Sequence, residues 1–254
     1  MKNQYVGDIG DYGKYGLLRF FADHDIRIGI NWYLTENDGS SDGKFTNYLN
    51  NPEDRIYDPE LFDSLKEIAF LPDKSVKMIE TANTVPHAVY FHEVLANADS
   101  SPVYRKWNRR LWFNNSTLVL EKAELVFADP DNGISYLKKD TAKGNEKYVM
   151  PQEIVEYYSQ GKDIAFYCHR GRRKQEEWEK TKTEIRKYIR DAQILVMTYH
   201  RGSQRSYIFV IHPDRYRTYA GLLKEFEKTK WGRLFSRESV TGNVLTTKEE
   251  MEWF

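Results

Sequence analysis

Hydrophobic and polar positions follow two periods along this chain. Short apolar runs typical of buried strands alternate with longer amphipathic segments typical of helices. The runs predict strands at residues 26–34, 88–95, 125–128, 163–169, 194–199 and 207–212. The amphipathic segments predict helices at residues 11–23, 59–82 with a break at Pro72, 101–113, 151–159, 174–190 and 216–228. Strands that alternate with helices predict an α/β fold with a mostly parallel sheet and helices on both faces.

The last two predicted strands are separated by seven residues, 200–206. A connection this short cannot hold the crossover that parallel neighbours need, so we expect an antiparallel hairpin. No repeat or Pro/Gly/Ser-rich linker interrupts the chain. The pattern therefore predicts a single Rossmann-like α/β domain over residues 1–215 that ends in an antiparallel hairpin, with a C-terminal helix and an irregular tail, residues 216–254, packed on it.

The most informative stretch is the turn Asp129-Pro130-Asp131-Asn132-Gly133, which directly follows the apolar run 125–128. Pro130 fixes φ and gives no N–H to a sheet, and Gly133 permits a positive φ. The turn therefore places two carboxylates, Asp129 and Asp131, at the end of a strand. Open α/β sheets bind their ligands at this edge, so both residues are candidates for catalysis.

Two other predicted strands end in His-Arg-Gly, at His169-Arg170-Gly171 and at His200-Arg201-Gly202. An imidazole can act as a general acid or base near neutral pH, and an arginine fork suits a phosphate or a carboxylate. His169 and His200 are therefore candidate catalytic residues, and Arg170, Arg172 and Arg201 are candidate phosphate ligands. The plainer interpretation is that polar residues gather where strands meet solvent.

The amino-acid composition limits the kinds of partner that the protein is expected to bind. The chain has 38 basic and 38 acidic residues, so any affinity for nucleic acid must come from a local patch. One such patch is 105–112, where arginines alternate with Trp107 and Trp112; this pattern is typical either of core tryptophans or of a platform for stacking bases. The single cysteine, Cys168, excludes an internal disulfide and is expected to be a small buried residue. No signal-peptide pattern and no apolar run of about 18 residues occurs, so we expect a cytoplasmic protein without a membrane segment.

A lysine-bearing segment, Tyr12-Gly13-Lys14-Tyr15-Gly16-Leu17-Leu18, precedes the first strand, and Asp11 is expected to cap its helix. A polar loop, residues 35–43, follows that strand, and Asp129-Pro130-Asp131-Asn132 follows a later one. This order of elements resembles the class I S-adenosylmethionine-dependent methyltransferases, and within them the nucleic-acid adenine-N6 methyltransferases.

The resemblance implies that S-adenosylmethionine is the cofactor and nucleic acid the partner. The residues that it assigns to the cofactor are Lys14, Glu36, Asp38 and Asp42. Asp129 would accept a hydrogen bond from the target amine, and Arg170, Arg172 and Arg201 would hold phosphates. The chain departs from the family pattern at Asp131, which stands where the family has a second proline, and at Asn132, which stands where it has an aromatic residue that stacks on the flipped base.

Asp131 also suits a different enzyme. With Asp129 it would bind Mg²⁺ or Mn²⁺ in a metal-dependent phosphodiesterase or nuclease, because these ions favour oxygen ligands. His169 or His200 would then act as general base or acid, and Arg170 and Arg201 would stabilise the charge on the phosphate. The third interpretation is a catalytically inactive Rossmann-like binding protein.

Overall fold

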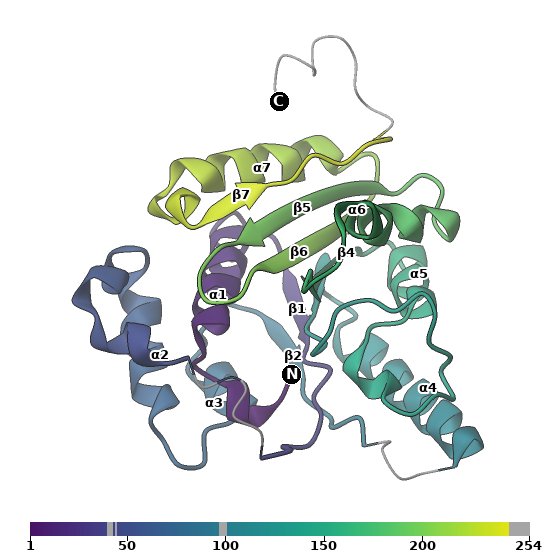
Figure 1. Cartoon of the computed structure of the whole chain (residues 1–254), viewed down its shortest axis with the longest axis horizontal. Coiled ribbons are helices and arrows are strands. Elements are labelled where there is room, and N and C mark those ends of the chain that lie inside the picture. Colours follow the sequence, from purple (N-terminus) through teal and green to yellow (C-terminus); the bar gives the residue numbers. More distant parts are fainter. Residues whose placement is uncertain (40–42, 44, 97–100, 244–254) are drawn as a thin grey trace.

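The computed structural model describes residues 1–39, 43, 45–96 and 101–243. Within these residues the fold is built on one seven-stranded sheet with the strand order β2-β1-β3-β4-β6-β5-β7 (Figure 1). The strands are β1 (Ile28–Asn31), β2 (Val89–Phe91), β3 (Leu125–Ala128), β4 (Asp163–His169), β5 (Gln193–Tyr199), β6 (Arg205–Ile211) and β7 (Phe235–Arg237).

The strands β2, β1, β3 and β4 are parallel, and β6 runs antiparallel to β4 and to β5. The predicted α/β fold, a mostly parallel sheet with a C-terminal antiparallel hairpin, is confirmed. β6 lies between β4 and β5, so the end of β5 is one strand farther from β3 than chain order suggests. The prediction of an irregular tail is wrong for the edge strand β7, which pairs antiparallel with β5. The division of the chain at residue 215 stays a prediction.

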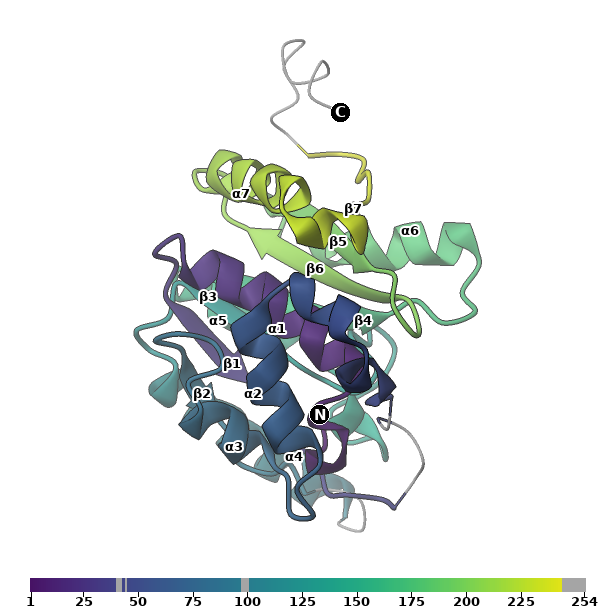
Figure 2. The ribbon, with the colours of Figure 1, turned by 90° about the vertical axis from the view of Figure 1, so that its left-hand side faces the viewer.

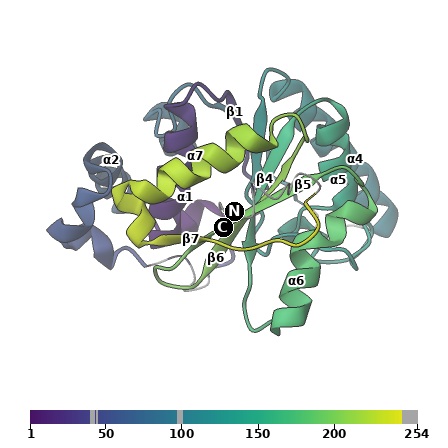
Figure 3. The same ribbon diagram turned by 90° about the horizontal axis from the view of Figure 1, so that it is seen from above.

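Helices cover both faces of the sheet, as the pattern predicts (Figures 1 and 3). One face carries α1 (Ile9–Ala22), α2 (Pro59–Ala69), α3 (Val76–Thr81) and α7 (Tyr216–Lys228). The other carries α4 (Pro102–Val119), α5 (Pro151–Ser159) and α6 (Gln175–Thr183). Figure 2 shows α1 and α2 in front of the sheet.

Side chains of one strand belong to two separate hydrophobic cores, because successive residues point to opposite faces. Along β3, Leu125 and Phe127 pack on the α1 side, while Val126 and Ala128 pack on the α4 side. All four are buried, which explains the continuous apolar run in the sequence.

Among the described residues, no helix is long and apolar enough to span a membrane.

Local turns explain where the predicted boundaries shift. β1 stops at Asn31 because Tyr33 takes a positive φ of 44° and donates its backbone N–H to the Asn31 side chain. α1 begins at Ile9, earlier than predicted, because Asp8 caps it and accepts a bond from the Gly10 N–H. The prediction that Asp11 is the cap is therefore wrong. Asp11 lies inside the first turn, is buried, and accepts a bond from the N–H of Gly7.

Candidate functional site

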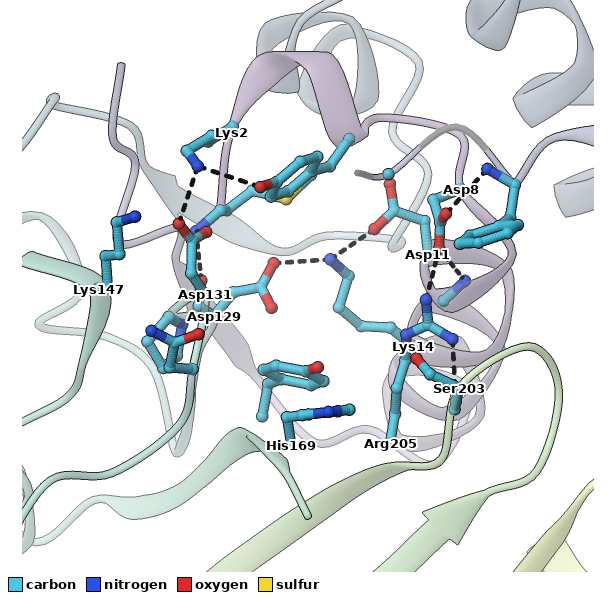
Figure 4. Close-up of a pocket in the computed structure, with 18 of the residues that line it drawn as sticks. Lys2, Asp8, Asp11, Lys14, Asp129, Asp131, Lys147, His169, Ser203 and Arg205 are labelled. Atoms are coloured by element: carbon cyan, nitrogen blue, oxygen red, sulfur yellow. Dashed lines mark hydrogen bonds and ion pairs between the residues drawn. The ribbon is translucent and has the colours of Figure 1, made fainter. Parts of the chain in front are cut away.

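A crevice of about 390 Å³ opens at the carboxyl ends of β3 and β4 (Figure 4). The N-terminus of α1 forms one wall, and the start of β6 forms another. Its volume is within the range of small-molecule sites. The charged residues that line it are Lys2, Asp8, Asp11, Lys14, Asp38, Asp129, Asp131, Lys147 and Arg205, together with His169.

The turn after β3 is anchored on both sides. The Asp129 N–H donates to the carbonyl of Asn31, at the end of β1, over 2.9 Å, and the Asn132 N–H donates to the carbonyl of Lys147 over 3.0 Å. Gly133 has φ +94°, the positive value that the sequence predicts to be permitted there. The backbone of the turn therefore fixes where Asp129 and Asp131 lie.

Gly133→Ala is expected to lower the free energy of unfolding by about 2 kcal/mol. A Cβ atom at Gly133 would lie 2.6 Å from Cys168 Sγ and 2.8 Å from Cys168 Cα, and the positive φ adds strain. Gly161→Ala is the matched control, since Gly161 has φ +79° and no atom lies within 4 Å of its added Cβ. Urea denaturation of both variants separates the steric cost from the φ cost; equal losses would show that the contact with β4 is unimportant.

Lys14 lies on the floor of the crevice between two carboxylates (Figure 4). Its Nζ is 2.6 Å from Asp129 Oδ2 and 2.7 Å from Asp11 Oδ1, and all three side chains are buried. Burial alone would lower the pKa of Lys14, but the two neighbouring carboxylates raise it above its ordinary value. Lys14 is therefore a charged ammonium that binds Asp129 to α1.

Asp131 has cations of its own. One carboxylate oxygen is 2.9 Å from the amino group of Met1, and the other is 3.5 Å from Lys2 Nζ. Burial would raise the pKa of Asp131, but these two cations lower it below its usual range. Among the described residues, neither Asp131 oxygen is in hydrogen-bond geometry, although both are buried.

No known protein family and no curated protein matches this chain. The case for function therefore rests on the residues of the crevice.

His169 lines the crevice from the end of β4, and its Nδ1 is buried without a hydrogen-bond partner among the described residues. Burial lowers the pKa of His169, and the nearby Arg205 and Arg173 lower it further. The lowered pKa favours the uncharged form of the imidazole, in which one ring nitrogen can accept a proton.

A second, more open hollow of about 490 Å³ adjoins the crevice and shares Asn132 and His169 with it. Arg170 and Arg172 line this hollow, as the phosphate-binding hypothesis requires. Within the described part of the chain, Arg172 and the crevice residue Lys147 form no ion pair, whereas the acids that line the crevice are paired. These cations favour an anionic ligand.

The structure does not bring every predicted site residue to the crevice. His200 Nε2 bonds to Ser236 Oγ, and Arg201 forms two bonds with the Asp54 carboxylate. Both follow β5, which the inserted β6 moves away from β3. Asp38 lines the crevice, paired with Lys2 at 2.6 Å, while Glu36 is exposed outside it. Asp42 lies outside the described residues.

Several crevice residues were not predicted from the sequence: Lys2, Asp8 and Lys147, and Asp11 in its actual role. Asp11 had a signal, because it precedes Lys14 by three residues and so shares a helix face with it. The pairing of Arg205 with Asp8 had no such signal, since the two residues are 197 positions apart in the chain.

Proposed function

We propose that this chain is a nucleic-acid-acting enzyme on a methyltransferase-like fold, with Asp129 as the group that accepts a hydrogen bond from an amine of the target base. The observation that carries the proposal is the buried Lys14–Asp129 pair at the floor of the crevice. Lys14 engages Asp129 Oδ2, and no described side chain bonds Asp129 Oδ1. One oxygen is therefore held in place while the other can accept a hydrogen bond from a ligand.

The donor set of the crevice fits S-adenosylmethionine, the cofactor that the resemblance implies. An amino-acid moiety needs carboxylates for its ammonium group and a cation for its carboxylate. Asp131, whose buried oxygens accept no hydrogen bond within the described residues, would hold the ammonium group together with Asp38, and Lys2 would hold the carboxylate. Bound there, the cofactor would supply an electrophilic methyl group.

The remaining side chains would act on the substrate. Asp129 would orient the amine, and His169 would accept the proton that the amine loses on methylation. Lys147 and Arg172 would bind phosphates, because both reach the connected hollows and neither has an ion pair in the described part of the chain. Arg170 lines the same hollow and donates to Gln175.

The test is methyl transfer from S-adenosylmethionine labelled in its methyl group to RNA and DNA. Asp129→Ala is expected to reduce the transfer rate about 100-fold, because the acceptor for the amine is lost. Asp129→Asn, which keeps an acceptor oxygen, is expected to retain more activity than Asp129→Ala. Asp63→Asn, at an exposed surface acid, is the control. Wild-type transfer that persists unchanged in Asp129→Ala would contradict the proposal.

A Mg²⁺- or Mn²⁺-dependent nuclease remains the second candidate, because the buried carboxylates of Asp129 and Asp131 are separated by a single residue in the turn after β3. The geometry supports it less. Lys14 already neutralises Asp129, and among the described residues no three His, Cys, Asp or Glu side chains lie close enough together to hold a metal ion. Cleavage of the same nucleic acids that requires a divalent ion and is lost in Asp131→Asn would favour this candidate.

A further inference from the structure

Two aromatic side chains are exposed on α4, on the face that turns away from the sheet. Trp107 is 58% exposed and Tyr104 is 49% exposed, and their ring centroids are 5.8 Å apart. By contrast, Trp112 of the same helix is buried and donates its indole N–H to the carbonyl of Glu93. Packing in the core therefore explains Trp112, whereas Trp107 has no structural role in it.

The surroundings of this aromatic pair are basic. The loop of residues 137–148 runs beside α4 and is bonded to it through Arg105, which donates to the Thr141 carbonyl, and Arg109, which donates to the carbonyls of Asn145 and Tyr148 (Figure 1). The basic residues of this combined surface are Arg105, Lys106, Lys138, Lys139, Lys143 and Lys147. Its acids are Asp140 and the buried Glu146. Basic residues therefore outnumber acidic residues on this surface, and because the whole chain has no net charge, this excess of positive charge is a local feature.

The same loop connects the aromatic pair with the candidate site. Lys147 lines the crevice, and the next residue, Tyr148, lines the hollow that Arg170 and Arg172 share. Tyr148 is also covered by the ammonium group of Lys138, which lies 5.2 Å from its ring centroid. Cations and aromatic rings therefore follow one another from α4 to the crevice.

We propose that this surface binds the part of a single-stranded nucleic acid that flanks the target base, with bases stacked on Trp107 and Tyr104 and phosphates on the loop lysines. The class of ligand rests on the proposed function. The combination of exposed aromatic rings with basic side chains is typical of proteins that bind single strands, since every base offers a face to stack on. A duplex keeps its bases stacked inside, so it would use the lysines and not the rings.

The test is fluorescence anisotropy of a labelled 20-nucleotide single strand, as DNA and as RNA, without cofactor. Trp107→Ala is expected to weaken binding about tenfold. Leu118→Ala is the matched control, because Leu118 is 74% exposed on the same helix but near its other end. Lys139→Gln is expected to reduce the dependence of binding on salt. An unlabelled duplex should compete more weakly than an unlabelled single strand.

The outcomes separate this inference from the proposed function. Equal affinity of wild type and Trp107→Ala, equal losses in Trp107→Ala and Leu118→Ala, or no binding by the wild type would each overturn the inference, while methyl transfer could still be observed. Binding that is lost in Trp107→Ala but kept in Asp129→Asn would support it. This support would hold even if no methyl transfer were detected, in which case the proposed function alone would fail.

Discussion

Lys14→Met is expected to lower the free energy of unfolding by about 3–5 kcal/mol, the cost of breaking a buried ion pair by removing one partner. Lys14 neutralises both Asp11 and Asp129, at 2.7 and 2.6 Å. Burial already raises the pKa of Asp11 in spite of Lys14, so this carboxylate is costly to keep charged. Without the ammonium group, two carboxylates would be left together in a site that water hardly reaches.

Urea denaturation at neutral pH measures this loss. Arg27→Ala is the control, because it removes an exposed ion pair with Glu124 and should cost less than about 1 kcal/mol. Asp11→Asn should cost less than Lys14→Met, since Lys14 then keeps Asp129 and the Gly7 N–H keeps an acceptor. A loss in Lys14→Met no larger than that in Arg27→Ala would show that the buried pair does not stabilise the fold.

The pH dependence of the same variant has a defined sign. The pKa of Lys14 is raised in the folded protein above its ordinary value of 10.5. A raised pKa contributes stability that is fully present below the unfolded value and is lost as the pH rises through the folded value. The difference in stability between wild type and Lys14→Met should therefore persist through neutral pH and shrink only in alkaline solution above pH 10.5.

Much of the fold was predictable because its central elements have strong local patterns. β3 and β4 have the predicted bounds, since each is a short apolar run with a turn or a charged residue after it. α5 begins at Pro151, as proline at a first helical position predicts. β7 was missed because it has only three residues, two of them polar, and its pairing with β5 leaves no periodic signal.

The candidate site was predictable where its residues are neighbours in the sequence. Asp129 and Asp131 share one turn, so the sequence placed them together at a strand end. The pairing of Lys14 with Asp129 joins residues 115 positions apart and depends on how α1 crosses the sheet. His200 and Arg201 were placed with the wrong neighbours because the sequence predicts a hairpin but not which of its two strands lies beside β4.

Arg109→Met is expected to have a second large effect, a loss of about 3–5 kcal/mol in the free energy of unfolding. Arg109 is buried and forms two bonds with the Glu153 carboxylate, at 2.7 and 2.8 Å. Glu153 also accepts bonds from the Tyr33 hydroxyl and the Met150 N–H, so it stays buried when its cation is removed. A buried carboxylate without a counter-charge is the source of the cost.

The same substitution should also loosen the loop of residues 137–148, which belongs to the surface that we propose for a single strand. Arg109 donates to the carbonyls of Asn145 and Tyr148, the bonds that hold the loop with Lys147 against α4. Arg110→Met is the matched control, because this neighbouring arginine is exposed and its pair with Glu156 should contribute less than about 1 kcal/mol. Urea denaturation and protease cleavage between residues 137 and 148 measure the two effects separately. If Arg109→Met were cleaved in this loop no faster than Arg110→Met, contacts other than those of Arg109 would hold Lys147 at the crevice.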